Sequence, residues 1–222
     1  AHIVVSSRLN FYRYQSSEHG NFDGFIAYQF IPLKDSDKQD YALAHGIINY
    51  QQFLDAVLRN SLQSLYENPF YFVEMIKYWK SAHTLPGRVE FMQSIINKII
   101  ENDIYKYDDH RQKKIDDEIQ RIRKALENTA FIMQCMHCTE LSSEDYLKAL
   151  PSSDIRELLK HIGLWSRNDK ENWAFEHNNF REFFASSFVN RMNLDEILQY
   201  TTMRGDQFAI RPSWMNTFSY LA

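Results

Sequence analysis

The stretch from residue 142 to residue 189 constrains the fold most, because helix and strand signals follow one another there in a defined order. A serine pair caps a short helix, and residues 151–163 open with Pro-Ser-Ser-Asp and close with glycine, as a second helix would. Two apolar runs, 164–166 and 173–176, flank a polar loop and predict a β-hairpin. Asn178 then caps a helix rich in phenylalanine. With the amphipathic helix before residue 142, this order predicts a winged-helix domain.

The region before it, from Lys34 to about Tyr107, has a helical pattern. Its apolar residues recur every three or four positions, as they do on the buried face of a helix: Tyr50, Phe53, Leu54, Val57, Leu58, Leu62 and Leu65. The chain restarts at Asn68, which is a good N-cap. Pro69 suits the first helical position, because the N–H that proline lacks would be unpaired there. Phe70 provides an aromatic anchor, so we expect a helical bundle here.

Two β-branched apolar runs, at residues 2–7 and 25–31, indicate buried strands of a parallel sheet. Two strands do not form a stable sheet alone, so we expect them to be the edge of a larger one and the sequence to begin inside a longer protein. The predicted fold class is mainly α: a fragment of a parallel α/β sheet edge, then a helical bundle and a winged-helix domain. The predicted domains are the end of a truncated domain (1–33), a helical domain (34–110), the winged helix (111–193) and the start of a following region (194–222).

The net charge, the number of cysteines and the lengths of the apolar runs argue against several classes of function. Among 222 residues, 25 basic and 29 acidic side chains give a net charge of −4, which disfavours a large nucleic-acid footprint. Cys135 and Cys138 are too few to staple a secreted scaffold, and they fit a reducing, cytoplasmic location. On a helix they share one face, where buried thiols are a better interpretation than a metal site. No apolar run approaches the roughly 18 residues of a membrane span, so no membrane partner is expected.

Three positions are candidates for binding a ligand, and the first two suit an anion. Arg8 lies where a parallel strand ends, and its guanidinium matches phosphate oxygens. His177 lies at the hairpin exit, just before a helix N-terminus, where it could donate a hydrogen bond to a phosphate. Asn68 with Pro69 forms the third, at another helix start. Each also has a simpler interpretation: a solvated arginine, a packed histidine and an ordinary helix cap.

No complete catalytic site is present in the sequence. It contains no GxxxxGK[ST] phosphate loop, no GxGxxG, no nucleophile elbow and no HExxH. We therefore expect no catalytic residue and no metal ligand in this chain.

The order of these segments resembles the NACHT branch of the STAND P-loop NTPases. It comprises a strand ending in VVSSR (4–8), one ending in IPL (31–33), a bundle with ENPF (67–70) and a winged helix closing in FEHNNFREFFAS (175–186). The last segment is the most specific, with a phenylalanine, a histidine, a second phenylalanine and a glutamate at the family's spacing: Phe175, His177, Phe180 and Glu182. The resemblance covers nearly the whole chain.

The resemblance implies a regulated ATP/ADP switch that assembles into larger complexes, with family members acting in defence. Arg8 would match the sensor arginine that reads the terminal phosphate, and Pro69, with its cap Asn68, the proline near the adenine. His177 would match the histidine that contacts the β-phosphate of ADP in the closed state. The Walker A and Walker B segments would precede Ile3. The expected partners are therefore nucleotide with Mg, the chain's own N-terminal NTPase domain, and protein partners including further copies of itself.

Without those segments, we expect this chain to be inactive as an ATPase and to hold no nucleotide tightly. Two other classes of function remain open. One is a DNA-binding winged helix that reads with Arg156, Lys160 and His161, although acidic neighbours oppose it. The other is a nucleotide-independent helical scaffold that binds protein partners through exposed aromatic residues such as Trp165, Trp173 and Trp214.

Overall fold

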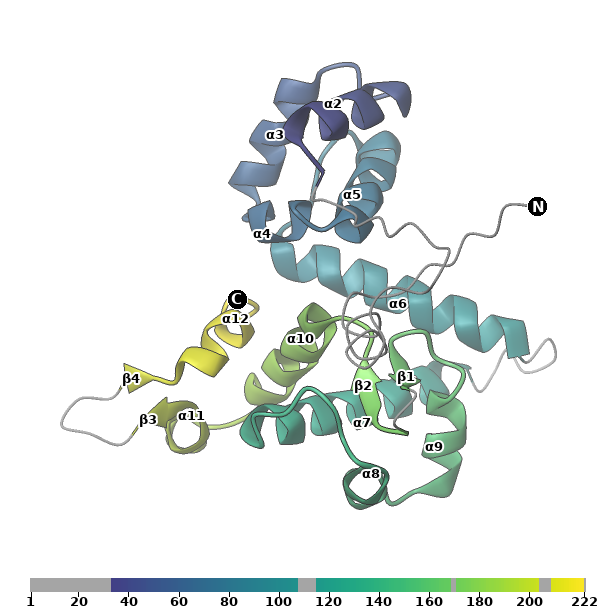
Figure 1. The fold of residues 1–222 in the computed structure, drawn as a ribbon, viewed down its shortest axis with the longest axis vertical. Helices are drawn as coiled ribbons and strands as arrows, with labels where there is room; N and C mark the ends of the chain where they lie inside the picture. The colour runs from purple at the N-terminus through teal and green to yellow at the C-terminus, as the bar shows by residue number, and fades with distance from the viewer. Residues whose placement is uncertain (1–32, 108–114, 169–170, 204–208, 222) are drawn as a thin grey trace, which may run out of the picture.

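The computed structural model describes residues 33–107, 115–168, 171–203 and 209–221. Within them the chain is mainly α-helical (Figure 1), as the sequence predicts. The two N-terminal strands predicted at 2–7 and 25–31, and Arg8 with them, lie outside the described residues.

The first half of the described chain is a bundle of helices. They are α2 (Asp35–Ala44), α3 (Tyr50–Arg59), α4 (Gln63–Tyr66), α5 (Pro69–Ala82) and α6 (Arg88–Tyr107). The aromatic residues on these helices form much of its core: Phe53, Tyr66, Phe72 and Trp79 are all buried. Phe53 meets Trp79 edge to face with ring centroids 5.5 Å apart, a favourable aromatic geometry.

The second half has the winged-helix order that the sequence predicts. Its elements are α7 (Ile115–Cys135), α8 (Ser143–Ala149), α9 (Ser153–Leu159), β1 (Trp165–Arg167), β2 (Trp173–Phe175) and α10 (Asn178–Val189). Strands β1 and β2 pair antiparallel, with Trp165 opposite Phe175. A bridge between Leu141 and Trp173 attaches the hairpin to the segment before α8.

The C-terminal part continues with α11 (Leu194–Thr201), β3 (Thr202–Met203), β4 (Ala209–Ile210), a 3₁₀ turn η1 (Pro212–Trp214) and α12 (Met215–Phe218). Helical spacing at Trp214 and Phe218 predicts one helix there, but the chain forms a turn and then a single helical turn. The pairing of β3 with β4 has no signal in the sequence.

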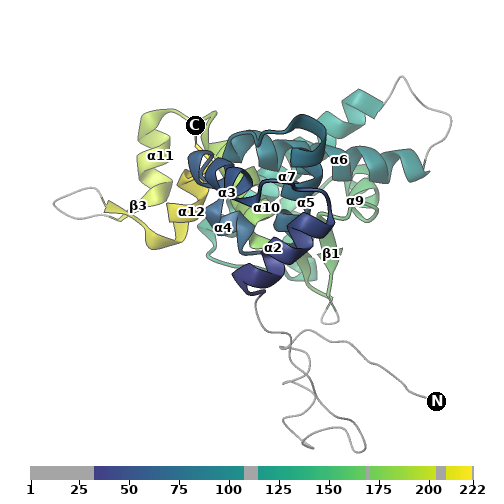
Figure 2. The ribbon, with the colours of Figure 1, turned by 90° about the horizontal axis from the view of Figure 1, so that it is seen from above.

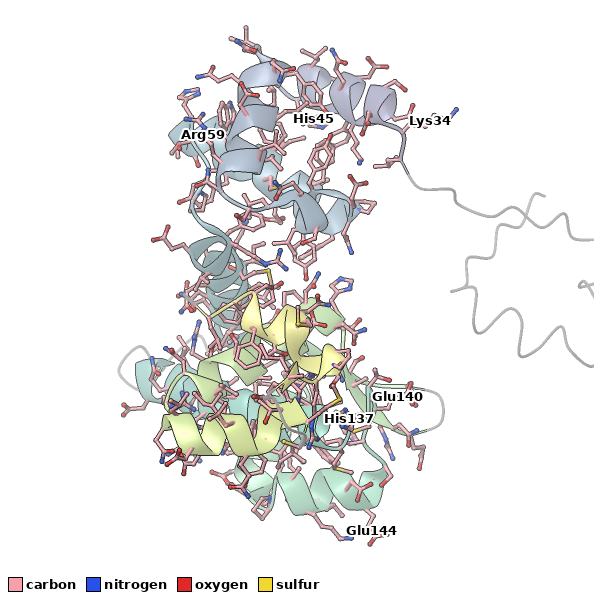
Figure 3. The ribbon with its side chains drawn as sticks, turned by 90° about the vertical axis from the view of Figure 1, so that its left-hand side faces the viewer. Lys34, His45, Arg59, His137, Glu140 and Glu144 are labelled. Carbon is pink, nitrogen blue, oxygen red and sulfur yellow. The ribbon has the colours of Figure 1, made fainter. Side chains whose placement is uncertain are left out.

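Helix α6 lies between the two halves (Figure 1). At its far end the Asp103 carboxylate accepts a hydrogen bond of 2.8 Å from the Gly163 N–H, beside the hairpin. Viewed from above (Figure 2), α11 and β3 lie at one end of the molecule, and α9 and the far end of α6 at the other. Figure 3 shows Lys34, His45 and Arg59 on the bundle half, and His137, Glu140 and Glu144 on the winged-helix half.

The core of the second half is the packing of α10 on α7. Small buried residues, Ala130 on α7 and Ala185 on α10, are both 0% exposed, and such residues let two helices approach closely. Phe183 and Phe184 fill the space beside them. This packing fixes the direction of α10 and therefore the position of its first turn, next to the hairpin.

Candidate functional site

The start of α5 is built as the sequence predicts. Asn68 is the N-cap, and its side-chain oxygen accepts a hydrogen bond of 2.9 Å from the Phe70 N–H. Pro69 occupies the first helical position. Since Pro69 has no N–H and Phe70 is capped, the helix starts sharply and directs Phe70 and Tyr71 toward the neighbouring half.

The start of α10 differs by one residue from the expectation. Helix α10 begins at Asn178, and His177 occupies the N-cap position with an extended backbone. The His177 side chain forms no capping hydrogen bond, whereas its carbonyl accepts the Phe180 N–H at 3.0 Å. Asn178 is therefore the first helical residue and not the cap. Strand β2 ends at Phe175, so the hairpin delivers His177 to this position.

The two helix starts meet. The Phe70 and His177 ring centroids are 5.4 Å apart, and those of Tyr71 and His177 are 6.0 Å apart. Phe180 completes the group, 6.2 Å from Phe70 and 5.6 Å from His177. We call this group of Phe70, Tyr71, His177 and Phe180 the α5–α10 contact. It brings together the two predicted binding positions that lie within the described residues, Asn68–Pro69 and His177.

The electrostatic setting of this contact is set by two helix N-termini. The N-termini of α5 and α10 carry the positive ends of their helix dipoles, and neither helix has an acidic residue in its first turn, although Glu67 and Glu176 directly precede the two N-cap residues. His177 is half-buried, whereas Asn178 and Pro69 are exposed, so the contact lies at the surface. The described residues here include hydrogen-bond donors and aromatic rings but no nucleophile paired with a base. Helix N-termini and a histidine are groups that can donate hydrogen bonds to an anion.

Behind the contact lies a group of polar residues that we call the polar cluster: Tyr71, Arg88, Glu182, Asn216 and Tyr220. Tyr71, Glu182 and Tyr220 are buried, Arg88 is half-buried and Asn216 is exposed. Arg88 Nη2 donates to Tyr220 Oη at 3.1 Å, and Asn216 Nδ2 donates to Glu182 Oε1 at 3.1 Å. Glu182 Oε2 is buried and has no hydrogen-bond partner among the described residues. The one sequence signal of this cluster is a carboxylate, Glu182, within a segment rich in phenylalanine.

Burial has a measurable consequence at Glu182. It raises the pKa of this carboxyl group above its ordinary value, although the hydrogen bond from Asn216 and the charges of Arg181 and Arg88 act in the opposite direction. A carboxyl group with a raised pKa in the folded state contributes stability that is lost as pH rises from its ordinary pKa through the folded one.

We therefore predict that Glu182→Gln removes this pH dependence, because the amide keeps the shape of the side chain but does not ionise. The free energy of unfolding of the wild type should fall relative to that of the variant as pH increases from about 4 toward 8. Urea unfolding at several pH values measures the difference. Parallel stability curves for the two proteins would contradict the assignment.

Two of the basic residues that a DNA-reading winged helix would use, Arg156 and Lys160, already have hydrogen-bond or ion-pair partners within this protein. Arg156 Nη1 donates to the carbonyls of Leu150 and Pro151 at 2.5 and 2.7 Å. Lys160 pairs with Glu157 at 2.5 Å. The partners of these cations leave little unpaired positive charge on α9 for a phosphate backbone.

The two cysteines lie at and just after the end of α7, where no metal ligand is expected. Cys135 and Cys138 are half-buried thiols, and burial is the main cause that raises the pKa of each. A raised pKa makes a thiol less reactive. Within the described residues no three histidine, cysteine or acidic side chains are grouped as metal ligands would be.

A shallow groove of about 220 Å³ lies between α5 and α6, away from the α5–α10 contact. Its two lysines, Lys77 and Lys98, both approach Glu74, at 2.5 and 3.6 Å. One carboxylate thus faces both lysines, and the groove contains neither His177 nor Asn68–Pro69.

No helix in the described part of the chain combines the length and apolarity required to cross a membrane. A comparison with protein-family models and with curated proteins found no match to this chain.

Proposed function

We propose that this chain is the regulatory portion of a NACHT/STAND-type ATP/ADP switch that controls nucleotide-dependent opening and oligomerisation. The nucleotide would lie between an upstream nucleotide-binding lobe and the α5–α10 contact. In this proposal His177 donates to the β-phosphate of ADP, Asn68 and Pro69 lie near the adenine, and Arg8 reads the terminal phosphate. The protein would act in the cytoplasm, with Mg accompanying the nucleotide and with protein partners, including further copies of itself, after activation.

One observation carries the proposal: Asn68–Pro69, which match the family's proline near the adenine, and His177 belong to helix starts that touch through Phe70 and His177 at 5.4 Å. An adenine nucleotide has a flat apolar base at one end and phosphates at the other. An aromatic and proline surface beside a histidine and a helix N-terminus matches both ends. The absence of acidic residues from both first turns supports the same proposal.

The switch follows from differential affinity. A ligand shifts a conformational equilibrium only by binding one state more tightly than the other. A hydrogen bond from His177 to a charged phosphate contributes about 1.5–3 kcal/mol. Because about 1.4 kcal/mol corresponds to a factor of ten, ADP would favour the closed state about ten- to a hundredfold through this bond.

The test is His177→Ala in the full-length protein. We expect ADP to dissociate about ten- to a hundredfold faster and the open, assembling form to become more populated. Mant-ADP dissociation and size-exclusion chromatography measure the two effects. His161→Ala is the matched control, because His161 is an exposed histidine of the same winged-helix half that lies next to α9. A His177→Ala protein that stays as tightly ADP-loaded and as closed as the wild type would refute the role of His177.

A further inference from the structure

The C-terminal segment 212–221 is anchored to helices of both halves. Trp214 is 0% exposed and lies 6.0 Å from the Phe131 ring on α7. The Gln134 side chain, also on α7, donates to the Ser213 carbonyl. Tyr220 is 3% exposed and meets Phe183 of α10 edge to face at 5.7 Å. A short segment with such anchors is docked in the way that a core element is.

The same segment reaches the bundle half through Arg88, the first residue of α6. The Arg88 guanidinium lies over the Tyr220 ring, 4.4 Å from its centroid, and donates to the Tyr220 hydroxyl. Its other nitrogen donates to Ser64 Oγ at 2.6 Å, which ties it to α4. Tyr220 therefore contacts α10 on one side and α6 on the other, and it connects the two halves by a cation–π contact and a hydrogen bond.

Tyr71 connects this anchor to the candidate site. Its ring lies 6.0 Å from His177, and its buried hydroxyl lies within the electrostatic influence of Tyr220, Glu182 and Arg88. From the opposite side, Asn216 of the C-terminal segment binds Glu182 of α10. A displacement of Tyr220 would therefore remove the ring contact with Phe183 that supports α10, the helix that starts directly after His177.

We infer that residues 212–221 form a strap that holds the α5–α10 contact closed. The contact of Tyr220 with the Arg88 guanidinium keeps this strap in place. The strap couples the C-terminal end of the described chain to the candidate site. Events that pull Tyr220 away from Arg88 open the contact between Phe70 and His177, whether or not a nucleotide is bound. The inference concerns the coupling within this chain, and it stands independently of the ligand proposed above.

Hydrogen–deuterium exchange on the 222-residue chain tests the strap. Tyr220→Ala should increase exchange about ten- to a hundredfold in peptides covering 212–221, 69–73 and 177–184. The reason is that the variant loses a hydrogen bond to a charged group together with the contacts of the tyrosine ring. Peptides within 153–159 of α9, which lies away from α12 in Figure 2, should keep their wild-type exchange. The Tyr220→Phe variant keeps the ring and loses only the hydroxyl, so it should give a smaller change with the same pattern.

Tyr200→Ala is the matched control, because it removes a tyrosine from the same C-terminal part that is 40% exposed and lies on α11. It should leave exchange at 69–73 unchanged. If Tyr220→Ala increases exchange only in 212–221, this segment does not support the α5–α10 contact and the strap is refuted. A uniform rise over all peptides, in both Tyr220 variants, would also refute it, since that pattern reports global destabilisation without specific coupling.

Discussion

Replacing Phe184 with alanine should lower the free energy of unfolding by about 3–5 kcal/mol. Phe184 is 0% exposed and packs at the centre of α10, with ring centroids 5.8 Å from Phe175 and 6.0 Å from Phe183. Truncation removes the buried ring and leaves a cavity that the close packing of α10 on α7 cannot fill by collapse. Urea or thermal unfolding, followed by far-ultraviolet circular dichroism, measures the loss.

The control for Phe184 is Leu194→Ala on α11, where the leucine is 68% exposed. That variant should change stability by no more than about 0.5 kcal/mol, because it removes little buried surface. A small effect of Phe184→Ala, similar to that of the control, would mean that α10 is not the central helix of the winged-helix half.

The second large effect is expected from Trp173→Ala, which should also cost about 3–5 kcal/mol. The Trp173 ring stacks on Tyr146 at 4.4 Å and lies 6.1 Å from Trp165. Its backbone exchanges two hydrogen bonds of 2.8 Å with Leu141. The side chain therefore holds together β1, β2 and α8, whose short length gives them little stability of their own.

Trp173→Phe separates the contribution of aromatic stacking from that of the truncation. It keeps a ring against Tyr146, so it should lose much less stability than the alanine variant in the same unfolding experiment. Equal losses for the two variants would contradict a stabilising stack. Because the hairpin delivers His177 to the α5–α10 contact, Trp173→Ala should also disturb that contact, visible as increased hydrogen exchange in 177–184.

Local signals predicted much of what the structure contains. The cap at Asn68 and the position of Pro69 are confirmed. The two hairpin strands lie within one residue of the predicted ones. The cap of α10 was misplaced by one residue, because Asn178 is the better capping residue by type whereas the hairpin geometry puts His177 there. Helix α9 ends at Leu159, earlier than its closing Gly163 suggests.

Other features have no local signal. Lys38 lies on a polar-looking helix, yet it is 2% exposed, because it lies over the Tyr66 ring at 4.3 Å and pairs with Glu67 at 2.7 Å. Glu182 is buried for a similar reason, since its partner Asn216 comes from a distant part of the chain. Sequence patterns favour exposure for charged side chains, and only a specific partner reverses that expectation.

The sequence by itself determined the local elements: where α5 starts, where the hairpin turns the chain, and that His177 precedes a helix. Caps, turn residues and apolar periodicity act over a few neighbouring residues, so they can be recognised without a structure. The tertiary structure alone decided that Phe70 meets His177 and that Tyr220 lies on Arg88. Such contacts depend on how whole helices dock, because the packing of α10 on α7 and the position of α6 set distances between residues that are far apart in the chain.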